Sequence, residues 1–229
     1  DLGKINEAEI SFRKALSLKP DFIEAHNNLG ISLQKQDKLQ DAEESFTRVT
    51  ALKPDLAEAH RNLAATLQKL GKFDASIASY IQTLKLNPNY SEALLDFGNA
   101  MMKARFKSSA THLYPFLIKL ITNGNLVRPS SMACSILSLL RHDPKINGLL
   151  NNATGLENPK QLLSAVQMLH GKPLLHHLMR LCPLPDLQFE RLFVSMRKAS
   201  LRELKNINEN AEAINFLSTL SIHCFLNEL

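Results

Sequence analysis

The chain has 229 residues, of which 45% are hydrophobic and 21% are charged, and its formal net charge is +5. This composition is typical of a globular protein and excludes an intrinsically disordered class. No apolar run approaches the roughly 18 residues of a membrane span, so we expect no membrane partner and a cytoplasmic location.

The charge excess lies in the second half of the chain. Residues 1–105 carry 14 basic and 14 acidic side chains, whereas residues 106–229 carry 13 basic and 8 acidic ones. An excess spread over so many residues argues against nucleic acid as a partner. The cysteines, Cys134, Cys182 and Cys224, are odd in number, far apart and surrounded by apolar residues, so we expect buried reduced thiols.

Three prolines mark a repeat in the first half. Pro20, Pro54 and Pro88 are 34 residues apart and lie in closely similar segments, such as Leu-Ser-Leu-Lys-Pro-Asp and Leu-Lys-Leu-Asn-Pro-Asn. A second segment follows each proline and begins with Glu-Ala, as in Glu-Ala-His-Asn-Asn-Leu-Gly. This 34-residue period and these two recurring segments resemble the tetratricopeptide repeat, a helix–turn–helix unit. The resemblance is strong up to residue 105.

Apolar residues recur at steps of three and four along this half, which predicts amphipathic helices. A proline cannot continue the helix before it, so each one separates two repeats. Stacked hairpins can bury apolar faces that a single hairpin leaves exposed. We expect helices near residues 5–18, 23–36, 39–52, 57–70, 73–86, 91–104 and 107–121.

Small residues at one repeat position predict where the two helices of a hairpin approach each other. These are Gly30, Ala64 and Gly98, and Phe46 and Tyr80 are expected to fill the space beside them. Two histidines, at residues 26 and 60, share another repeat position, where we expect packing between helices with one ring nitrogen satisfied.

The 34-residue frame is lost after residue 105, but helical periodicity continues. Prolines at 159 and 173 suit the first turn of a helix, and Asp186 suits an N-cap for the apolar stripe that follows. We expect further helices over 133–141, 159–169, 173–181 and 209–226. The predicted fold class is all-α, with a solenoid at 1–121 and an irregular helical domain at 122–229. The resemblance implies a right-handed superhelix with a partial repeat, two full repeats and a degenerate last repeat.

The resemblance also implies which residues face the concave groove of the solenoid, because the first helix of each tetratricopeptide repeat lines it. In this chain Asn28 and Asn62 occupy one repeat position and Asp96 takes it next, which is similar to the asparagine ladder of O-linked N-acetylglucosamine transferases. Solvated or locally bonded asparagines are the alternative. The predicted peptide-binding residues are Asn27, Asn28, Gln34, Lys35, Arg61, Asn62, Gln68, Lys69, Asp96 and Asn99.

Motifs for catalysis, metals and cofactors are missing from the sequence. The eight glycines never fall two or three residues apart, so no phosphate-binding loop is expected. The residues at 170, 176, 177 and 182 (three histidines and a cysteine) lack the tight spacing of zinc ligands, so we expect no metal site. The chain is therefore predicted to be a non-enzyme without a cofactor.

The first functional hypothesis is a protein-interaction module that binds an extended peptide or a partner helix in its groove. A weaker resemblance of residues 186–228 to the helical linker of bacterial tetratricopeptide proteins with a methyltransferase-like domain suggests an alternative. In that alternative the chain recruits substrates for a larger transferase, either methyltransferase-like or a glycosyltransferase. A third hypothesis is self-association through the first helix, whose apolar residues at 5, 10, 12, 16 and 18 are expected to be uncovered.

Overall fold

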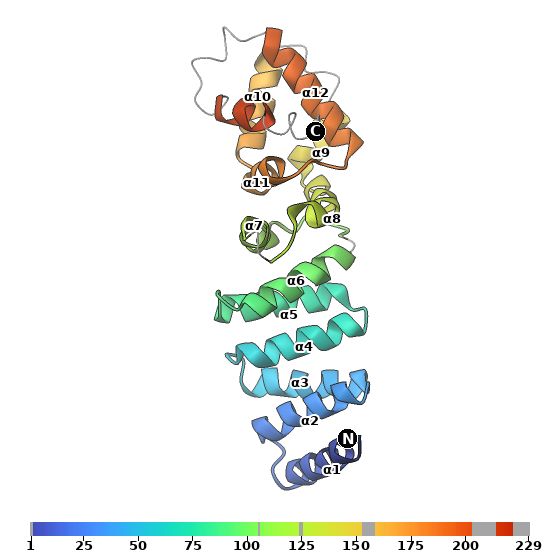
Figure 1. Cartoon of the computed structure of the whole chain (residues 1–229). Coiled ribbons are helices and arrows are strands. Elements are labelled where there is room, and N and C mark those ends of the chain that lie inside the picture. Colours follow the sequence, from blue (N-terminus) through green and yellow to red (C-terminus); the bar gives the residue numbers. More distant parts are fainter. Residues whose placement is uncertain (1, 105, 124–125, 153–158, 203–213, 222–229) are drawn as a thin grey trace. The chain divides into compact units, whose positions relative to one another are not determined.

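The computed structural model describes residues 2–104, 106–123, 126–152, 159–202 and 214–221 (Figure 1). The chain forms two compact units, Asp1–Ala104 and Arg105–Leu229. All regular elements in the described residues are helical, which confirms the predicted all-α repeat fold.

Six helices form the first unit, and each packs against the next along the chain (Figure 1). Their bounds agree with the predicted helices to within a few residues. They are α1 (Leu2–Leu18), α2 (Ile23–Lys35), α3 (Leu39–Leu52), α4 (Ala57–Lys69), α5 (Phe73–Leu86) and α6 (Ser91–Lys103).

The turns inside the hairpins are alike in successive repeats. Asp37 has a φ of 60° and Gly71, 34 residues later, has a φ of 74°. The left-handed region suits glycine and tolerates aspartate better than most residues. The backbone N–H of Lys38 then donates to the Leu33 carbonyl at 2.9 Å, and the next repeat has the equivalent bond. These contacts end α2 and α4 and reverse the chain into α3 and α5.

The contact between Gly30 and Phe46 confirms the prediction that small residues allow the helices of a hairpin to approach closely. A Cβ atom added to Gly30 would lie 2.7 Å from the ring of Phe46. Phe46 is fully buried and packs with Leu29 and Leu33. Tyr80 holds the same place in the next repeat and is also buried. The core of this unit therefore depends on a large side chain of one helix fitting against a residue with little or no side chain.

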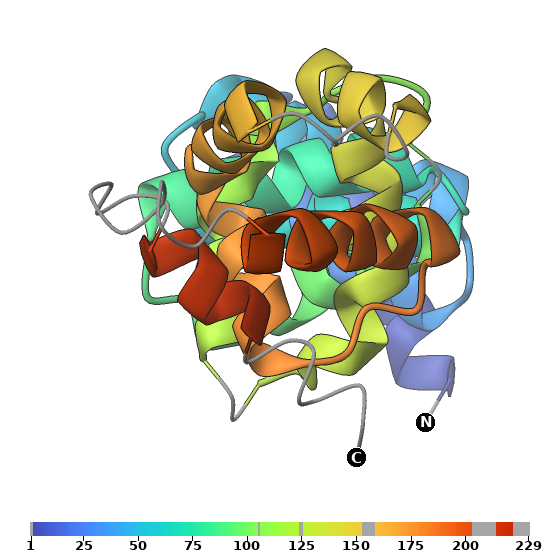
Figure 2. The same ribbon diagram turned by 90° about the horizontal axis from the view of Figure 1, so that it is seen from above.

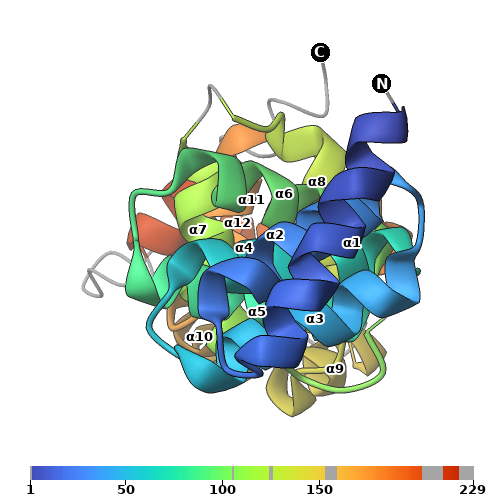
Figure 3. The same cartoon turned by 90° about the horizontal axis from the view of Figure 1, so that it is seen from below.

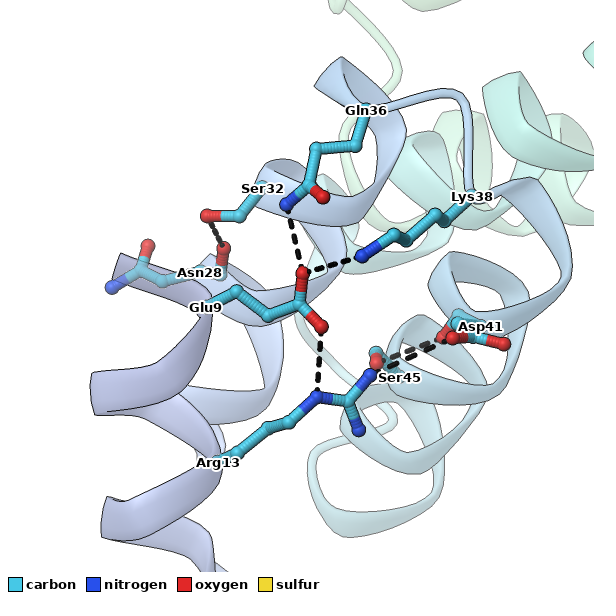
Figure 4. Close-up of polar contacts among 8 residues, drawn as sticks. All are labelled: Glu9, Arg13, Asn28, Ser32, Gln36, Lys38, Asp41 and Ser45. Atoms are coloured by element: carbon cyan, nitrogen blue, oxygen red, sulfur yellow. Dashed lines mark hydrogen bonds and ion pairs between the residues drawn. The ribbon is translucent and has the colours of Figure 1, made fainter. Parts of the chain in front are cut away.

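Glu9 connects three helices through polar contacts (Figure 4). Its carboxylate accepts hydrogen bonds of 2.9 Å from the side chains of Lys38, Arg13 and Gln36. The hydrogen bonds from Lys38, then Arg13 and Gln36, lower the pKa of Glu9 to about 2. Arg13 also reaches Asp41 of α3 at 3.5 Å. These contacts tie α1 to the α2–α3 hairpin.

The same ion pair recurs one repeat later. Lys72 lies 2.7 Å from the carboxylate of Glu43, and both residues are 34 positions after Lys38 and Glu9. The next equivalent positions hold Ile77 and Phe106, so this polar ladder cannot continue. The loss of the ladder coincides with the end of the repeat frame.

The two repeat histidines behave as predicted. His26 Nε2 lies 2.8 Å from the carbonyl oxygen of Pro20, and His60 Nε2 lies 2.8 Å from that of Pro54. Each histidine thus has one satisfied ring nitrogen and fixes the turn between two repeats.

One side of α1 has no helix over it in the first unit (Figure 3). Ile10 and Leu18 are 68% and 81% exposed, whereas Phe12 and Leu16 pack partly against the Leu29 cluster. The predicted uncovered face is therefore narrower than the sequence suggested, because α2 and α3 already cover part of it.

The described helices of the second unit do not follow the 34-residue repeat. Its helices are η1 (Thr111–Leu113), α7 (Tyr114–Thr122), α8 (Pro129–Arg141), α9 (Pro144–Asn151), α10 (Pro159–His170), α11 (Pro173–Leu181) and α12 (Leu187–Arg202). Residues 214–221 are also helical, whereas the rest of the helix predicted at 209–226 lies outside the described residues.

The division between the units differs from the boundary predicted at residue 121. The sequence assigned 107–121 to a degenerate last repeat, but α7 packs against α8 and α11 of the second unit. Its buried residues, Leu117, Leu120 and Ile121, supply the apolar face for those contacts. A helical period alone does not reveal which neighbour a helix packs against.

Helix α9 was not predicted from the sequence. Asp143 is its N-cap and accepts hydrogen bonds from the backbone N–H groups of Lys145 and Ile146. The buried Asp143 carboxylate also forms an ion pair with Lys172. Burial raises the pKa of Asp143, but the hydrogen bond and charge of Lys172 and the two backbone hydrogen bonds together outweigh burial, so the net shift is downward. The sequence signal for this helix start, which the prediction did not use, is an aspartate N-cap followed directly by a proline.

Helix α12 begins as predicted and packs against α9 and α10 (Figure 2). Asp186 accepts hydrogen bonds from the N–H groups of Gln188 and Phe189, and it pairs with Arg141 of α8 at 2.5 Å. The predicted stripe is buried; it comprises Phe189, Leu192, Phe193, Met196 and Ser200.

Candidate functional site

Helices α2, α4 and α6 form one face of the first unit. Helix α2 contacts α4, and α4 contacts α6. On the opposite side, α1 and α3 diverge around a cleft of about 1050 Å³ whose floor includes Leu29 and Leu33. The contacts of α4 with both α2 and α6 agree with the prediction that this face is the concave one, and we call it the concave face.

All ten predicted peptide-binding residues lie on these three helices. Asn28, Lys35 and Lys69 are exposed. The others are half-buried; they are Asn27, Gln34, Arg61, Asn62, Gln68, Asp96 and Asn99. The face is therefore polar and accessible, although most of these side chains are also partly covered by neighbouring residues.

Amide groups link α2 to α4. Asn62 Nδ2 donates to Asn27 Oδ1 at 3.4 Å. Gln34 Nε2 donates to the hydroxyl of Thr66 at 2.5 Å and lies 3.4 Å from the Asn62 carbonyl oxygen. Asn62 thus has a partner within the protein, whereas the Asn28 side chain is exposed. The two asparagines of the predicted ladder are not equivalent.

Arg61 joins α4 to α6 by pairing with Asp96, which holds the third position of the predicted ladder. Its guanidinium lies 3.1 Å from the carboxylates of both Asp96 and Glu92, and 5.5 Å from the ring centre of Tyr90. Desolvation opposes its charge, but the hydrogen bond with Asp96 and the charges of Asp96, Tyr90 and Glu92 together outweigh desolvation and raise the pKa of Arg61. Because Asp96 is already paired, it cannot continue a ladder of amides.

Gln68 takes part in the packing of its own hairpin. Its Oε1 accepts a hydrogen bond of 3.1 Å from the hydroxyl of Tyr80. Burial raises the pKa of Tyr80, so the hydroxyl remains a donor. Gln68 therefore has a structural role besides its place on the concave face.

Sequence reasoning did not anticipate the roles of Thr66 and Tyr90. Thr66 is fully buried and is the partner of Gln34, 32 residues away. Tyr90 lies at the start of α6, where it contacts Arg61. The spacing of Arg61 and Asp96, 35 residues, was a usable signal for their pairing, because it joins neighbouring positions on successive repeats.

Two half-buried histidines of the second unit contact each other. The rings of His170 and His176 meet edge to face at 5.5 Å, and His176 also lies 5.2 Å from Phe216. Burial, followed by the charges of His170, His177 and Arg180, lowers the pKa of His176 to about 4. Within the described residues, no group of three or more His, Cys, Asp or Glu side chains could hold a metal ion.

The cysteines differ from the expectation of uniform burial. Cys182 is buried, and burial raises the pKa of its thiol to about 11. Cys134 is exposed, because it lies on the side of α8 opposite Ile136 and Leu140. Cys224 lies outside the described residues. In the part of the chain that the structure covers, no helix has the length and apolarity to cross a membrane.

Family models match residues 1–90 of the chain. Models described as "Tetratricopeptide repeat" match residues 23–56 and 57–90, and a model described as "TPR repeat" matches residues 1–37. Residues 1–90 are tetratricopeptide repeats. This fold is in general a non-catalytic scaffold for protein partners, so the first unit is a protein-interaction module. The comparison with curated protein sequences gives no match.

Several solved structures are similar to this chain at low sequence identity. A Thermobaculum terrenum O-GlcNAc transferase mutant is 23% identical, with a TM-score of 0.44 over 53% of this chain; the chain covers 23% of that enzyme. A tetratricopeptide repeat protein from Parabacteroides merdae is 16% identical, with a TM-score of 0.45, and 99% of this chain and 82% of that one are covered. YrrB, described as a TPR protein with an unusual peptide-binding site, is 9% identical, with a TM-score of 0.37 and coverage of 95% and 98%.

Proposed function

We propose that the tetratricopeptide unit holds an extended segment of a protein partner against the concave face of α2, α4 and α6. The observation that carries this proposal is the register of polar side chains on that face. Asn28, Asn62 and Asp96 occupy equivalent positions on α2, α4 and α6, and each of these side chains is at least partly accessible. Side-chain amides can both donate to and accept from a peptide backbone without reading its sequence.

The internal contacts of the face favour this use. The amide bridge from Asn62 to Asn27 and the ion pair of Arg61 with Asp96 hold the side chains in place before a ligand arrives. Groups that are already ordered lose less conformational entropy on binding. Asn28, which is exposed, supplies a free amide beside them.

The test uses peptides selected from a random display library against the whole chain. Their affinity is then measured for the wild type and for Asn28→Ala/Asn62→Ala, with circular dichroism as the check on folding. We expect the double variant to remain folded and to bind about tenfold more weakly, because each hydrogen bond contributes about 0.5–1.5 kcal/mol.

The matched control is Asn6→Ala/Gln40→Ala, which removes two exposed amides from α1 and α3. It should leave the affinity unchanged. Unchanged binding by the Asn28/Asn62 variant, or equal losses in both variants, would contradict the proposal.

A further inference from the structure

A stripe of four positions repeats on the concave face. Its members are spaced i, i+4, i+7 and i+11, which places them within about 60° of one another around each helix. The stripe reads Glu24, Asn28, Ile31, Lys35 on α2; Glu58, Asn62, Ala65, Lys69 on α4; and Glu92, Asp96, Asn99, Lys103 on α6. Each helix thus carries a glutamate near one end of the stripe and a lysine near the other.

The two ends of the stripe form two rows across the three helices. A glutamate and a lysine on one helix are 11 residues apart, or about 16 Å along its axis. We call the set Lys35, Lys69 and Lys103 the lysine row. All three of its members are exposed and lie in the last turn of their helices.

The acidic side of the face is partly neutralised, whereas the lysine row is not. Glu92 and Asp96 both pair with Arg61. Among the described residues, the structure contains no ion pair that involves a member of the lysine row. Together with Arg61, the stripe carries four positive and four negative charges, but its three lysines lie together at one end, which favours an acidic ligand at that end.

Helix dipoles explain part of this pattern but not all of it. A cation near a helix C-terminus is stabilising wherever it lies around the axis. The dipole therefore accounts for a lysine in the last turn of each helix. It does not require all three lysines to share one stripe on the concave face.

We propose that the lysine row binds an acidic peptide in the polyproline II conformation, with a carboxylate at every third residue. Helices in contact are about 8–10 Å apart. A polyproline II chain has three residues per turn and rises about 3.1 Å per residue, so equivalent side chains recur on one side every ~9 Å. Carboxylates at i, i+3 and i+6 match Lys35, Lys69 and Lys103. This inference rests on the proposed function and specifies the ligand of that same face.

The test measures fluorescence anisotropy of labelled nine-residue peptides with the whole chain at low salt. One peptide contains three Pro-Pro-Glu units. A second has the same composition with its three glutamates adjacent, and a third has lysine in place of glutamate. We expect the spaced acidic peptide to bind at least about threefold more tightly than the adjacent one. The basic peptide should not bind, and added salt should weaken binding, because exposed charges are screened.

Protein variants locate the contact. Lys35→Gln/Lys69→Gln/Lys103→Gln should bind the spaced peptide about tenfold more weakly, since each exposed ion pair changes affinity by about twofold. The control Lys14→Gln/Lys53→Gln/Lys85→Gln removes the same charge from exposed positions at or beside α1, α3 and α5, and should bind like the wild type.

The following results would overturn the inference. Equal binding of spaced and adjacent peptides, or equal losses in both lysine variants, would show unspecific attraction between charges. If heparin binds and neither acidic peptide does, the lysine row is a site for anionic polymers. If display-selected peptides bind through Asn28 and Asn62 while no acidic peptide does, the proposed function stands and this inference fails. If no peptide of any charge binds, both fail.

Discussion

The first unit makes the same contacts at 34-residue intervals, whereas the contacts described for the second unit follow no such interval. In the first unit the pair Glu9–Lys38 recurs as Glu43–Lys72, and the two repeat histidines make identical bonds. In the second unit Asp143 caps α9 and pairs with Lys172, and Asp186 caps α12 and pairs with Arg141. These two aspartates join different elements and do not lie at a repeat spacing. A repeated contact can be lost at one site while its copies remain. A single contact has no copy, so we expect mutations to act differently in the two units.

The largest effect is expected for Phe46→Ala. Removing a fully buried phenylalanine beside Gly30 should lower the free energy of unfolding by about 3–5 kcal/mol. Hydrogen exchange measured by mass spectrometry should show lost protection in α2–α4 and unchanged protection in α8–α12, because a repeat contacts only its neighbours. Phe73→Ala, at a half-buried site, is the control with a smaller loss. Lost protection throughout the chain would mean that the two units unfold together.

Asp143→Ala should destabilise the second unit by about 2–3 kcal/mol, because it removes a helix cap and leaves Lys172 without its partner. Asp143→Asn retains a capping group and should lose less. Urea unfolding measures both variants, and Asp74→Ala, an exposed first-turn residue of α5, is the control that should change little. Equal losses for Asp143→Ala and Asp143→Asn would assign the whole effect to the ion pair.

His176 should make the second unit sensitive to acid. Its pKa is about 4 in the folded protein and near 6.5 when unfolded, so the unfolded chain binds the proton more readily. Stability is therefore present above pH 6.5 and is lost as the pH falls toward 4, by about 1–2 kcal/mol after allowance for solvent screening of the half-buried ring. His176→Gln should flatten this part of the pH profile of thermal unfolding, and His112→Gln, an exposed control, should not.

The smallest effect is expected for Glu9→Gln, at about 1 kcal/mol, because Lys38 and Arg13 are about half exposed and screened by solvent. The lowered pKa of Glu9 contributes stability above about pH 4.5 that is lost as the pH falls toward 2. Urea unfolding across that range should show a weaker pH dependence in the variant. Glu43→Gln, with one cationic partner, should cost less; an equal cost would mean that Arg13 and Gln36 add nothing.

The repeat half of the chain was far more predictable than the other half. The spacing of Pro20, Pro54 and Pro88 placed the helices to within a few residues, and the pairing of Gly30 with Phe46 was correct. In the second unit, α9 was missed and α7 was assigned to the wrong neighbours. Each repeat offers a further copy of the same evidence, whereas a helix that occurs once must be recognised from a single cap or apolar stripe.

For the candidate site, the sequence predicted the face but not the state of its side chains. All ten predicted residues lie on α2, α4 and α6. We did not predict from the sequence that Asn62 bonds to Asn27 or that Arg61 pairs with Asp96, although both pairs are 35 residues apart. Such bonds depend on distances between helices 35 residues apart, which the repeat period does not specify.

The amino-acid sequence by itself determined the helical class, the 34-residue repeat and the side of each helix that faces the core, because these follow from local periodicity and from the conformational limits of proline and glycine. Only the tertiary structure decided which polar groups are paired and which remain available. It showed that Glu92 and Asp96 are paired with Arg61, whereas Lys35 and Lys69 have no ion pair among the described residues. Pairing depends on distances of a few ångströms between separate helices, and those distances arise only when the hairpins stack.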